Sequence, residues 1–594
     1  MKIKYLIIAL AVSMTACKDF LEPDSPSTFD QNYIFSNAED ARKAVNAIYV
    51  HFSKDGFRSR LSNNMTGNTD IEHNWGTGST ARYELWRLEP STTNDDLKQF
   101  WEAAYQAIRD ANIAIEGISA SSALNSPTDG PTMKHLLGEA YTLRAYWYSM
   151  LCYHFGDVPF MTEAPKAGNN FNLPRTDRNE ILSSVIQDMI GAEAKMLWGD
   201  QLPFGIEQVN REYTLGMIAR LALQRGGYYL TPGMNMERKT DYLDYYTIAR
   251  DYTKKLINLK DRALPTNFKQ IFLNQCQFIS PENEDILFEV PFAIGFGDVG
   301  WNIGYKVDGG THPYGSGSNY MNVPATYFYS FDKEDIRRDA TCGMYYIDKD
   351  FVKQLVGVGN MSQAKWGRQF IPTPPGPTTA KGTGINWPMM RYPDVLLMYA
   401  EAENELNGPT AEAQEAFKRV RRRAFPMATW ATKVDAYTSG VAGSKQDFFN
   451  AIVNERAWEF GGEMIRKYEL IRWNLYKEKV QATVNGLKTL ATNAHNGTSN
   501  LPDYLFVKLN SSGELLIHNR DTKVLVAPDE TWTKKSWLIN LYDETKPENV
   551  AEFITTHWAN YLKAGAVRYI YPIPQIAIDA SQGVLENDGY GYGK

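Results

Sequence analysis

Two short helices joined by the turn Gly408-Pro409 are predicted by residues 393–407 (PDVLLMYAEAENELN) and 410–424 (TAEAQEAFKRVRRRA). Pro393 stands where a helix can begin, because its missing N–H and fixed φ suit the first helical position. Gly408 and Pro409 favour a stop between the two segments. The stretch therefore predicts a helical hairpin.

A second pair of segments has the same character. Residues 211–229 and 243–258 are joined by a Thr-Pro-Gly turn, and the small residues Ala219 and Ala249 stand among large apolar ones. Small residues facing large ones on paired helices, with a period of about 34 residues, are typical of tetratricopeptide-like packing. We therefore predict a mainly α fold: a tetratricopeptide-like helical hairpin scaffold with a long irregular, loop-rich insert and a few short β-strands.

Further helical patterns flank the two hairpins. Ser36 is the predicted N-cap of the first, since Glu39 follows three residues later. Residues 53–94 are rich in Asn and Gly and predict loops. The expected helices cover residues 36–52, 95–118, 132–155, 177–198 and 445–476.

The stretch 260–390 differs from the helical regions. It has Gly and Pro clusters, short alternating runs such as 285–291 (DILFEVP), and no helical period. An irregular segment of this length is uncommon unless it is functional. The predicted organisation is a signal peptide (1–16), a tether (17–35), an N-terminal helical repeat scaffold (36–259), an irregular ligand-binding insert (260–390), a second helical repeat region (391–478) and a mixed loop-rich C-terminal segment (479–594).

The N-terminus is typical of an export signal. Lys2 and Lys4 flank the start of the apolar run 5–12 (YLIIALAV), which is too short to cross a bilayer as a helix. The residues Met14-Thr15-Ala16-Cys17 look like a bacterial lipobox, in which the cysteine is lipidated and becomes the first mature residue. The alternative is a plain signal peptide with a chance cysteine. We expect a chain that leaves the cytoplasm and is tethered by lipid on Cys17.

Composition and motifs argue against several classes of protein. The 594 residues carry a net charge of −7 without a dense basic run, which argues against nucleic-acid binding. The histidines show no metal-ligand spacing, and neither a Walker A motif nor a G-x-S-x-G motif occurs. Residues 295–300 match G-x-G-x-x-G, but WNIGYKVDGG follows and cannot form the helix that a dinucleotide site needs. We expect no cofactor and no metal, while a disulfide between Cys276 and Cys342 stays open.

Two carboxylate pairs stand four residues apart on predicted helices: Glu455 with Glu459, and Glu401 with Glu405. A glycoside hydrolase needs two carboxyl groups on either side of a bound sugar. We expect structural roles instead, with the second pair facing solvent or the arginines 421–423, themselves a predicted solvated helix face. The expected ion-pair partners of Glu455 and Glu459 are Arg456, Arg466 and Arg472.

Aromatic side chains make up 13% of the chain, and some stand in polar, glycine-rich loops. A flat ring in a loop can stack on the C–H face of a sugar, while charged neighbours hydrogen-bond its hydroxyls. The alternative is that each ring is a local apolar plug, as we expect for Trp86, Trp101, Trp147 and Trp458 in helical or strand-like patterns. The predicted ligand-binding residues are Asp70, Trp75, Trp301, Tyr305, Tyr314, Tyr320 and Arg368.

Several segments, in order, resemble the SusD-like (RagB/SusD) outer-membrane lipoproteins of Bacteroidota. Cys17-Lys18-Asp19 is similar to the acidic signal that sends such lipoproteins to the cell surface. The other matching segments are 100–112 (FWEAAYQAIRDAN), 138–160 (GEAYTLRAYWYSMLCYHFGDVPF), 391–405 (RYPDVLLMYAEAENE), 454–473 (NERAWEFGGEMIRKYELIRW) and 571–589 (YPIPQIAIDASQGVLENDG).

The resemblance implies a function. It implies a non-enzymatic, surface-exposed lipoprotein of the outer membrane that captures oligosaccharides and delivers them to a SusC-like TonB-dependent transporter barrel. The repeat helices would pack on the barrel, and the irregular insert would carry the ligand site. Three alternatives stay open: the same architecture capturing peptides, a glycoside hydrolase on a helical scaffold, and a purely structural adaptor.

Overall fold

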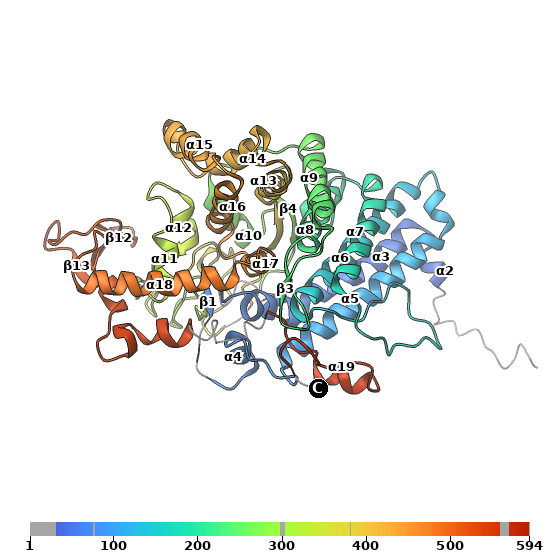
Figure 1. Ribbon diagram of the computed structural model, residues 1–594, viewed down its shortest axis with the longest axis horizontal. Helices are drawn as coiled ribbons and strands as arrows, with labels where there is room; N and C mark the ends of the chain where they lie inside the picture. Colours follow the sequence, from blue (N-terminus) through green and yellow to red (C-terminus); the bar gives the residue numbers. More distant parts are fainter. Residues whose placement is uncertain are drawn as a thin grey trace, which may run out of the picture.

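Helices stacked side by side make up most of the molecule (Figure 1). The structure is a computed structural model that describes residues 31–74, 76, 78–297, 303–379, 382–558 and 569–592. The main helices are α3 (Ala38–Tyr49), α5 (Asp95–Ala120), α6 (Gly130–Phe155), α7 (Arg178–Ala192), α8 (Arg211–Arg225), α9 (Tyr242–Leu259), α10 (Phe268–Gln277), α13 (Tyr392–Asn407), α14 (Ala411–Arg422), α16 (Lys445–Phe460), α17 (Arg466–Arg472) and α18 (Tyr476–His495).

Shorter elements connect and flank this stack. The short helices are α2 (Gln31–Ile34), α4 (Ala81–Trp86), α11 (Ala325–Phe328), α12 (Arg337–Thr341), α15 (Tyr437–Val441) and α19 (Gln575–Ala580). The strands are β1 (His73–Asn74), β2 (Tyr229–Leu230), β3 (Met236–Glu237), β4 (Ile286–Val290), β5 (Met321–Val323), β6 (Cys342–Gly343), β7 (Tyr345–Ile347), β8 (Lys353–Leu355), β9 (Met361–Gln363), β10 (Trp387–Arg391), β11 (Tyr504–Leu509), β12 (Leu515–Ile517) and β13 (Thr533–Ser536).

The two predicted helical hairpins are confirmed, and they pack on each other. In the described chain α8 packs on α9, α9 packs on α13 and α13 packs on α14 (Figure 1). Ala219 and Ala249 are fully buried, so their small side chains let the helix axes approach closely. The row continues through α7, α6 and α5 on the other side of α8, and the mainly α, tetratricopeptide-like fold class is confirmed.

Polar caps set the helix starts, and one differs from the prediction. The Asn94 side chain accepts from Leu97 N–H at the start of α5, and Thr410 caps α14 in the same way through Ala413 N–H. The first long helix is capped by Asn37, whose side chain accepts from Asp40 N–H, and not by the predicted Ser36. The Ser36 hydroxyl instead donates to the Tyr33 carbonyl, which ends the preceding turn.

The single helix expected over 445–476 is wrong, because the chain turns between α16 and α17. Gly462 has φ of +82°, a conformation that glycine adopts without strain. The Gly462 N–H donates to the Glu72 carboxylate, 3.1 Å away, which ties this turn to the N-terminal part of the chain. The bend separates the two halves of the predicted helix and lets each contact different neighbours.

Three regions expected to be irregular contain helices. The insert 260–390 includes α10, capped by the Asn267 side chain, and the C-terminal segment begins within α18. The loop region 53–94 contains α4 and a π-helix over Gly56–Met65. The expected strand at 285–291 is confirmed as β4, which pairs with β10. Buried apolar residues from Phe35 to Tyr590 form one cluster, and the predicted division of the chain into segments stays a prediction.

A buried ion-pair network joins the second hairpin to the rest of the fold. Arg391, at the start of α13, donates to Glu463 (2.7 Å), Glu459 (2.8 Å) and Asp285 (3.0 Å). Arg337 donates to Glu455 at 2.7 Å and to Glu459 at 3.2 Å. These groups lie just before β4, at the end of β10, in α12, in α16 and just after α16, so the network fixes elements that are distant in the sequence.

The network corrects two expectations about charged residues. Arg421 pairs with Glu455 and Arg423 pairs with Glu459, and both arginines are buried rather than solvated. The main partners of Glu455 and Glu459 are therefore Arg337, Arg391, Arg421 and Arg423, not the predicted Arg456, Arg466 and Arg472.

Glu401 is also buried rather than solvated, and it pairs with Arg472. Glu405, four residues later, is half-buried and pairs with Lys445 at 3.0 Å. Each carboxylate of this predicted pair thus has its own cationic partner.

Glu459 is ionised within this network. Burial alone would raise the pKa of Glu459, but the attraction of Arg423, Arg391 and Arg337 lowers it well below its usual range. A buried carboxylate between several guanidinium groups stabilises the fold only while each charge has its partner.

We therefore expect Glu459→Gln to destabilise the protein strongly, by about 3–5 kcal/mol, because buried arginines lose their counter-charge. Chemical denaturation followed by tryptophan fluorescence measures the change. The matched control is Glu415→Gln, which removes a solvent-exposed partner of Arg422 and should cost less than about 1 kcal/mol. Equal effects of the two substitutions would contradict the role of the network.

Candidate ligand-binding site

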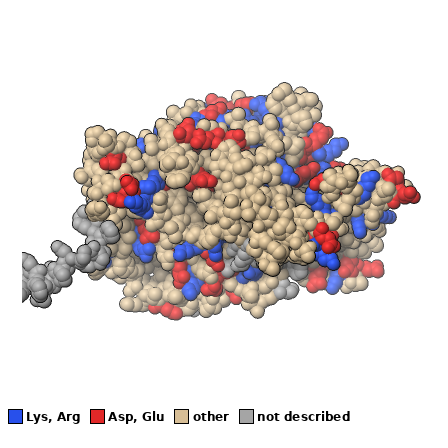
Figure 2. Space-filling view, turned by 180° about the vertical axis from the view of Figure 1, so that it is seen from behind, with Lys and Arg blue, Asp and Glu red and all other residues tan. Residues whose placement is uncertain are grey.

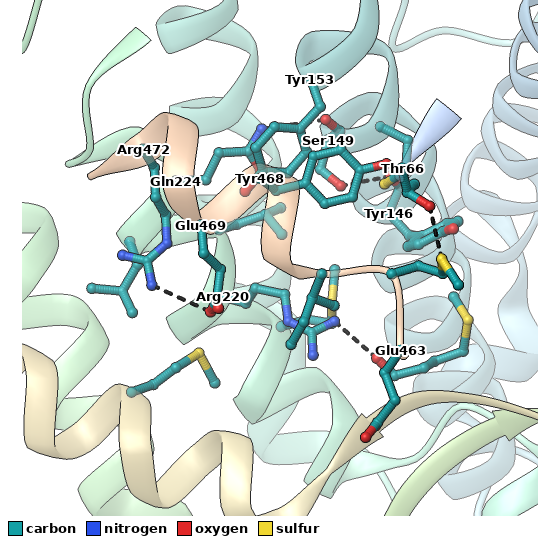
Figure 3. A pocket seen from close by; sticks show the side chains of 18 of the residues that line it. Thr66, Tyr146, Ser149, Tyr153, Arg220, Gln224, Glu463, Tyr468, Glu469 and Arg472 are labelled. Carbon is teal, nitrogen blue, oxygen red and sulfur yellow. Dashed lines mark hydrogen bonds and ion pairs between the residues drawn. The ribbon is translucent and has the colours of Figure 1, made fainter. Parts of the chain in front are cut away.

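The interior of the helical scaffold contains a cavity of about 90 Å³ (Figure 3). Apolar and aromatic side chains line it together with five charged ones, Arg220, Arg456, Glu463, Glu469 and Arg472. The charged groups of Arg472 and Glu469 lie 3.7 Å apart. Sites for larger ligands are several times bigger. A ligand of several sugar units therefore needs a different site.

A short β-ladder joins the segment that follows Asp70 to the segment that follows Tyr320, two of the predicted ligand-binding residues. Strand β1 pairs antiparallel with β5, with Asn74 opposite Met321 and His73 opposite Asn322. Tyr320 immediately precedes β5, so the pairing places it at the end of the ladder where β1 ends and β5 begins. Strands β9 and β6 extend this sheet and bury it on the scaffold.

Buried asparagines fix this ladder to its surroundings. The Asn68 side chain accepts from Asn74 N–H and donates to the Trp86 carbonyl, both at 3.1 Å. On the other strand, Asn319 donates to the Asn322 side chain at 2.8 Å. Asn68 thus links β1 to α4, and this link places the side chains of α4 beside the start of β5.

Two half-buried tyrosines rest on a buried tryptophan at this end of the ladder. The Tyr83 ring lies edge-on to the Trp86 ring, with centroids 5.1 Å apart, and the Tyr320 ring lies 5.4 Å from Trp86 on a tilted plane. Trp86 is 2% exposed, so it serves as the fixed base on which the two outer rings pack. We call Tyr83, Trp86 and Tyr320 the aromatic platform.

The edge of the aromatic platform carries a cation and a closely packed loop. The guanidinium carbon of Arg82 lies 5.6 Å from the centre of the Tyr320 ring, within the range of a cation–π contact. Arg82 has no carboxylate within 4 Å among the described residues. A Cβ atom at Gly76 or Gly78 would come within 2.2 Å of the Tyr83 ring, so only glycine lets this loop lie against it.

A second aromatic group lies in the insert. The rings of Tyr314 and Phe351 stack with centroids 5.0 Å apart and an angle of 9°, and His312 lies 5.2 Å from Phe351. Phe351 has φ of +63° and remains 41% exposed. The Asp348 carboxylate holds this tight turn by accepting from Asp350 and Val352 N–H groups. The structure thus presents Phe351 in an uncommon backbone conformation.

Two predicted ligand-binding residues are buried, which contradicts the expectation that they face a ligand. Tyr305 is 4% exposed, and its ring stacks on Tyr345 at 4.3 Å. Arg368 is 2% exposed and donates to the carbonyls of Tyr314 (2.8 Å) and Thr379 (2.9 Å). The sequence placed both in a polar region, but packing between strands covers them. Arg368 is therefore a positioning residue for the loop that carries Tyr314.

Asp70 forms an ion pair with Arg466. Its two carboxylate oxygens accept from the Arg466 guanidinium at 2.9 and 2.6 Å. The bidentate pair joins the segment before β1 to α17. Asp70 thus supports the ladder, while Trp75, Trp301 and the predicted lipidation site Cys17 lie outside the described residues.

Tyr83 and Phe351 belong to the two aromatic groups but were not among the residues predicted from the sequence. Tyr83 belongs to no recognisable motif, and its only signal in the sequence was its place shortly after the glycine-rich loop 76–78. Phe351 follows the turn-forming run Asp348-Lys349-Asp350, which marks a tight turn that could present a ring. The expected buried positions of Trp101 and Trp147 are confirmed, whereas Trp458 is half-buried at the edge of a surface pocket.

Other chemistry has little support in the described part of the chain. These residues contain no group of three or more His, Cys, Asp or Glu side chains that could hold a metal ion. Cys152, Cys276 and Cys342 are buried free thiols, so the disulfide that the sequence left open is not formed. Within the described ranges, none of the helices has the length and apolar character needed to cross a membrane. Figure 2 shows acidic and basic side chains interspersed on one face, without a continuous basic patch.

Comparison with known proteins identifies the family. A family model described as "SusD family" matches residues 330–590, and another described as "Starch-binding associating with outer membrane" matches residues 19–215. The chain belongs to the SusD-like family. SusD-like protein P25 of Formosa agariphila is 23% identical over 529 residues, covering 81% of this chain and 92% of that protein. A SusD-like protein of Bacteroides ovatus is 22% identical over 506 residues, covering 80% and 83%.

Solved structures share the SusD-like fold. A SusD homolog from Bacteroides thetaiotaomicron superposes with a TM-score of 0.73 at 22% identity, covering 94% of this chain and 98% of that one. Surface glycan-binding protein A from Bacteroides thetaiotaomicron, in complex with laminarihexaose, superposes with a TM-score of 0.58 at 14% identity, covering 93% and 99%. The agreement extends nearly over the whole chain and confirms the resemblance seen in the sequence.

The ladder that positions the aromatic platform begins beside a buried carboxyl group. Glu72 precedes β1 and accepts from Gln363 at 2.9 Å as well as from Gly462 N–H. Burial raises the pKa of Glu72 to about 8. An unfolded glutamate ionises near its ordinary value of about 4.3, so raising the pH toward 8 favours the unfolded chain.

We therefore expect the stability of the wild type to fall, relative to Glu72→Gln, as the pH rises from 5 to 8. Glutamine keeps the size and hydrogen bonds of the neutral carboxyl group without the cost of ionising it. Thermal melting of both proteins over this pH range measures the difference. Glu478→Gln, on the exposed side of α18, should track the wild type at every pH. A constant difference between wild type and Glu72→Gln would contradict the raised pKa.

Proposed function

We propose that this SusD-like protein captures oligosaccharides outside the cell and does so on the aromatic platform. The observation that carries the proposal is the pair of half-buried rings, Tyr83 and Tyr320, held on buried Trp86. The predicted residues Trp75 and Trp301 lie outside the described residues and stay predicted ligand contacts on the evidence of the sequence alone. A relative of the same fold is described in complex with laminarihexaose, which supports a sugar as the ligand.

Binding would combine ring stacking with hydrogen bonds to hydroxyl groups. A sugar presents a C–H face that packs on an aromatic ring, and each such contact buries apolar surface. Arg82 stands beside Tyr320 and has donors for ring oxygens and hydroxyls. Because the aromatic platform is fixed by Asn68 and the ladder, little ordering is needed when a ligand binds. A few rings and donors give moderate affinity, which suits a protein that must release its ligand again.

Delivery to a transporter forms the second part of the proposal. The lipobox-like residues 14–17 support lipid anchoring at Cys17, and the description of the family model that matches residues 19–215 supports association with the outer membrane. We propose that the anchored, surface-exposed protein passes its oligosaccharide to a SusC-like TonB-dependent barrel. The helical stack provides a rigid surface for packing on this partner.

The proposed role is capture without catalysis. A hydrolase of the usual kind needs one carboxyl group that holds a proton and one that is free to attack or to activate water. Glu459 is held ionised by Arg423 and Arg391, and Glu401 is held by Arg472. Both are buried inside the scaffold, away from the aromatic platform. This arrangement favours structural roles for the two carboxylate pairs.

We expect calorimetric titration of the lipid-free chain to show saturable binding of at least one oligosaccharide from a panel, but not of a mixed peptide pool. Tyr320→Ala should weaken that binding about tenfold, since one stacking surface is lost. Trp75→Ala and Trp301→Ala should weaken it as well. Phe204→Ala is the matched control, because this ring is 64% exposed and precedes α8 on the scaffold.

Two results would contradict the proposal. Binding of peptides alone would assign the chain to peptide capture, and it would contradict the proposal that the tyrosine rings stack on sugars. Release of reducing sugar by the purified wild type, lost in Glu459→Gln but not in a stability-matched variant, would assign it to hydrolysis.

A further inference from the structure

A pocket of about 390 Å³ opens between α11, α16, α17 and α18. It lies at the other end of the β1–β5 ladder from the aromatic platform. Asp70, before β1, and Tyr327, in α11 after β5, both line it, whereas the platform adjoins the residues after β1 and before β5. The two sites are therefore distinct. The volume falls within the range of about 300–1,000 Å³ that is typical of ligand sites.

An anchored tryptophan forms one wall of this pocket. Trp458 is half-buried, and its indole N–H donates to the Ser330 hydroxyl at 3.0 Å. The buried Arg421 guanidinium lies 5.6 Å from the ring centre, on a side chain that also pairs with Glu455. These contacts fix the ring in place at the pocket edge. A fixed ring with an open face can stack on the C–H face of a sugar.

The polar groups of the pocket leave one positive charge uncompensated. The Asp70–Arg466 pair in the wall is bidentate, so its two charges cancel each other. Lys479, on α18, lines the pocket and has no carboxylate within 4 Å among the described residues. The side chain of Asn454 also lines the pocket and makes no hydrogen bond with the described chain. An ammonium group and an amide thus stand free beside the tryptophan ring.

This combination selects a particular class of ligand. A neutral sugar would use the ring and the amide but leave the ammonium group unpaired. A small inorganic anion would use the ammonium group but leave the ring uncovered. A sugar unit that carries a carboxylate or sulfate group uses all three, and a hydrogen bond between two charged groups is stronger than one between neutral groups.

We propose that this pocket, which we call the α16–α18 pocket, binds an acidic sugar unit, with Trp458 stacking on its ring and Lys479 pairing with its charged group. The inference rests on the proposed function only in taking a sugar as the ligand. It adds a second binding site, and it names the chemical class of the ligand, an acidic sugar, which the aromatic platform leaves open.

Three oligosaccharides of equal length test this proposal: one containing uronic acid, one sulfated and one neutral. We expect the wild type to bind an acidic one more tightly than the neutral one, with a difference that shrinks as salt is added. Lys479→Met should reduce affinity for that ligand about tenfold, and Lys479→Arg should restore most of it. The acidic ligand whose affinity falls in Lys479→Met identifies the charged group, carboxylate or sulfate, that Lys479 binds.

Control variants separate this site from the aromatic platform. Lys477→Met removes an exposed lysine of the same helix and should change nothing. Tyr320→Ala should weaken binding of the neutral oligosaccharide while leaving the effect of Lys479→Met on the acidic one intact. Trp458→Leu removes the stacking face and should weaken binding of the acidic oligosaccharide, while thermal melting checks that the variant folds; unchanged binding would contradict the role of the ring.

Equal affinity of wild type and Lys479→Met for both acidic ligands would overturn the inference. Failure of every acidic ligand to bind would overturn it as well. If the neutral oligosaccharide still bound and remained sensitive to Tyr320→Ala, the proposed function would stand without this second site. If none of the three oligosaccharides bound, both the proposed function and this second site would be contradicted.

Discussion

The buried ion pairs around Arg391 and Glu459 hold the fold in register. Arg391 begins the second helical hairpin, and its guanidinium group reaches Asp285 before β4 and Glu459 and Glu463 at the end of α16. Each of these charges is desolvated, so each needs the others, and removal of one leaves the rest exposed to an apolar interior. This mutual dependence fixes the turn after α16, where Gly462 adopts the backbone geometry that the network imposes.

The same turn also fixes the position of the β1–β5 ladder beneath the aromatic platform. The Gly462 N–H holds Glu72, and Arg466 holds Asp70, so both anchors lie just before β1. Asn68 then ties β1 to the carbonyl of Trp86. A chain of directional contacts thus runs from the scaffold to the aromatic platform. In the proposed function, rigid support of this kind would let the two tyrosine rings bind an oligosaccharide without ordering a loop first.

The helical hairpins could be predicted from the sequence, but the turn between α16 and α17 could not. Hairpins depend on local patterns, such as small Ala219 and Ala249 among large apolar residues. Such a pattern lies within one short segment, so the sequence of that segment is enough to recognise it. The break at Gly462 depends on a partner, Glu72, from the other end of the chain. The burial of Arg421 and Arg423 likewise depends on Glu455, Glu459 and Asp285, which no local pattern connects to them.

The candidate site shows the same division between local and distant information. Polar, aromatic loops in the sequence lie next to both strands of the ladder, and Tyr320, which stays a predicted ligand contact, is half-buried beside β5. The pairing itself involves two- and three-residue strands, which are too short for a periodic signal. Tyr305 was predicted to face a ligand, yet Tyr345 covers it, and only the structure brings those two residues together.

The most direct test of the account is a crystal structure of the lipid-free chain with an oligosaccharide that binds in solution. We expect a sugar ring in contact with the Tyr83 or Tyr320 side chain, and a Trp86 side chain in the same position as in the free protein. A well-ordered oligosaccharide that touches neither tyrosine, bound elsewhere on the scaffold, would contradict it.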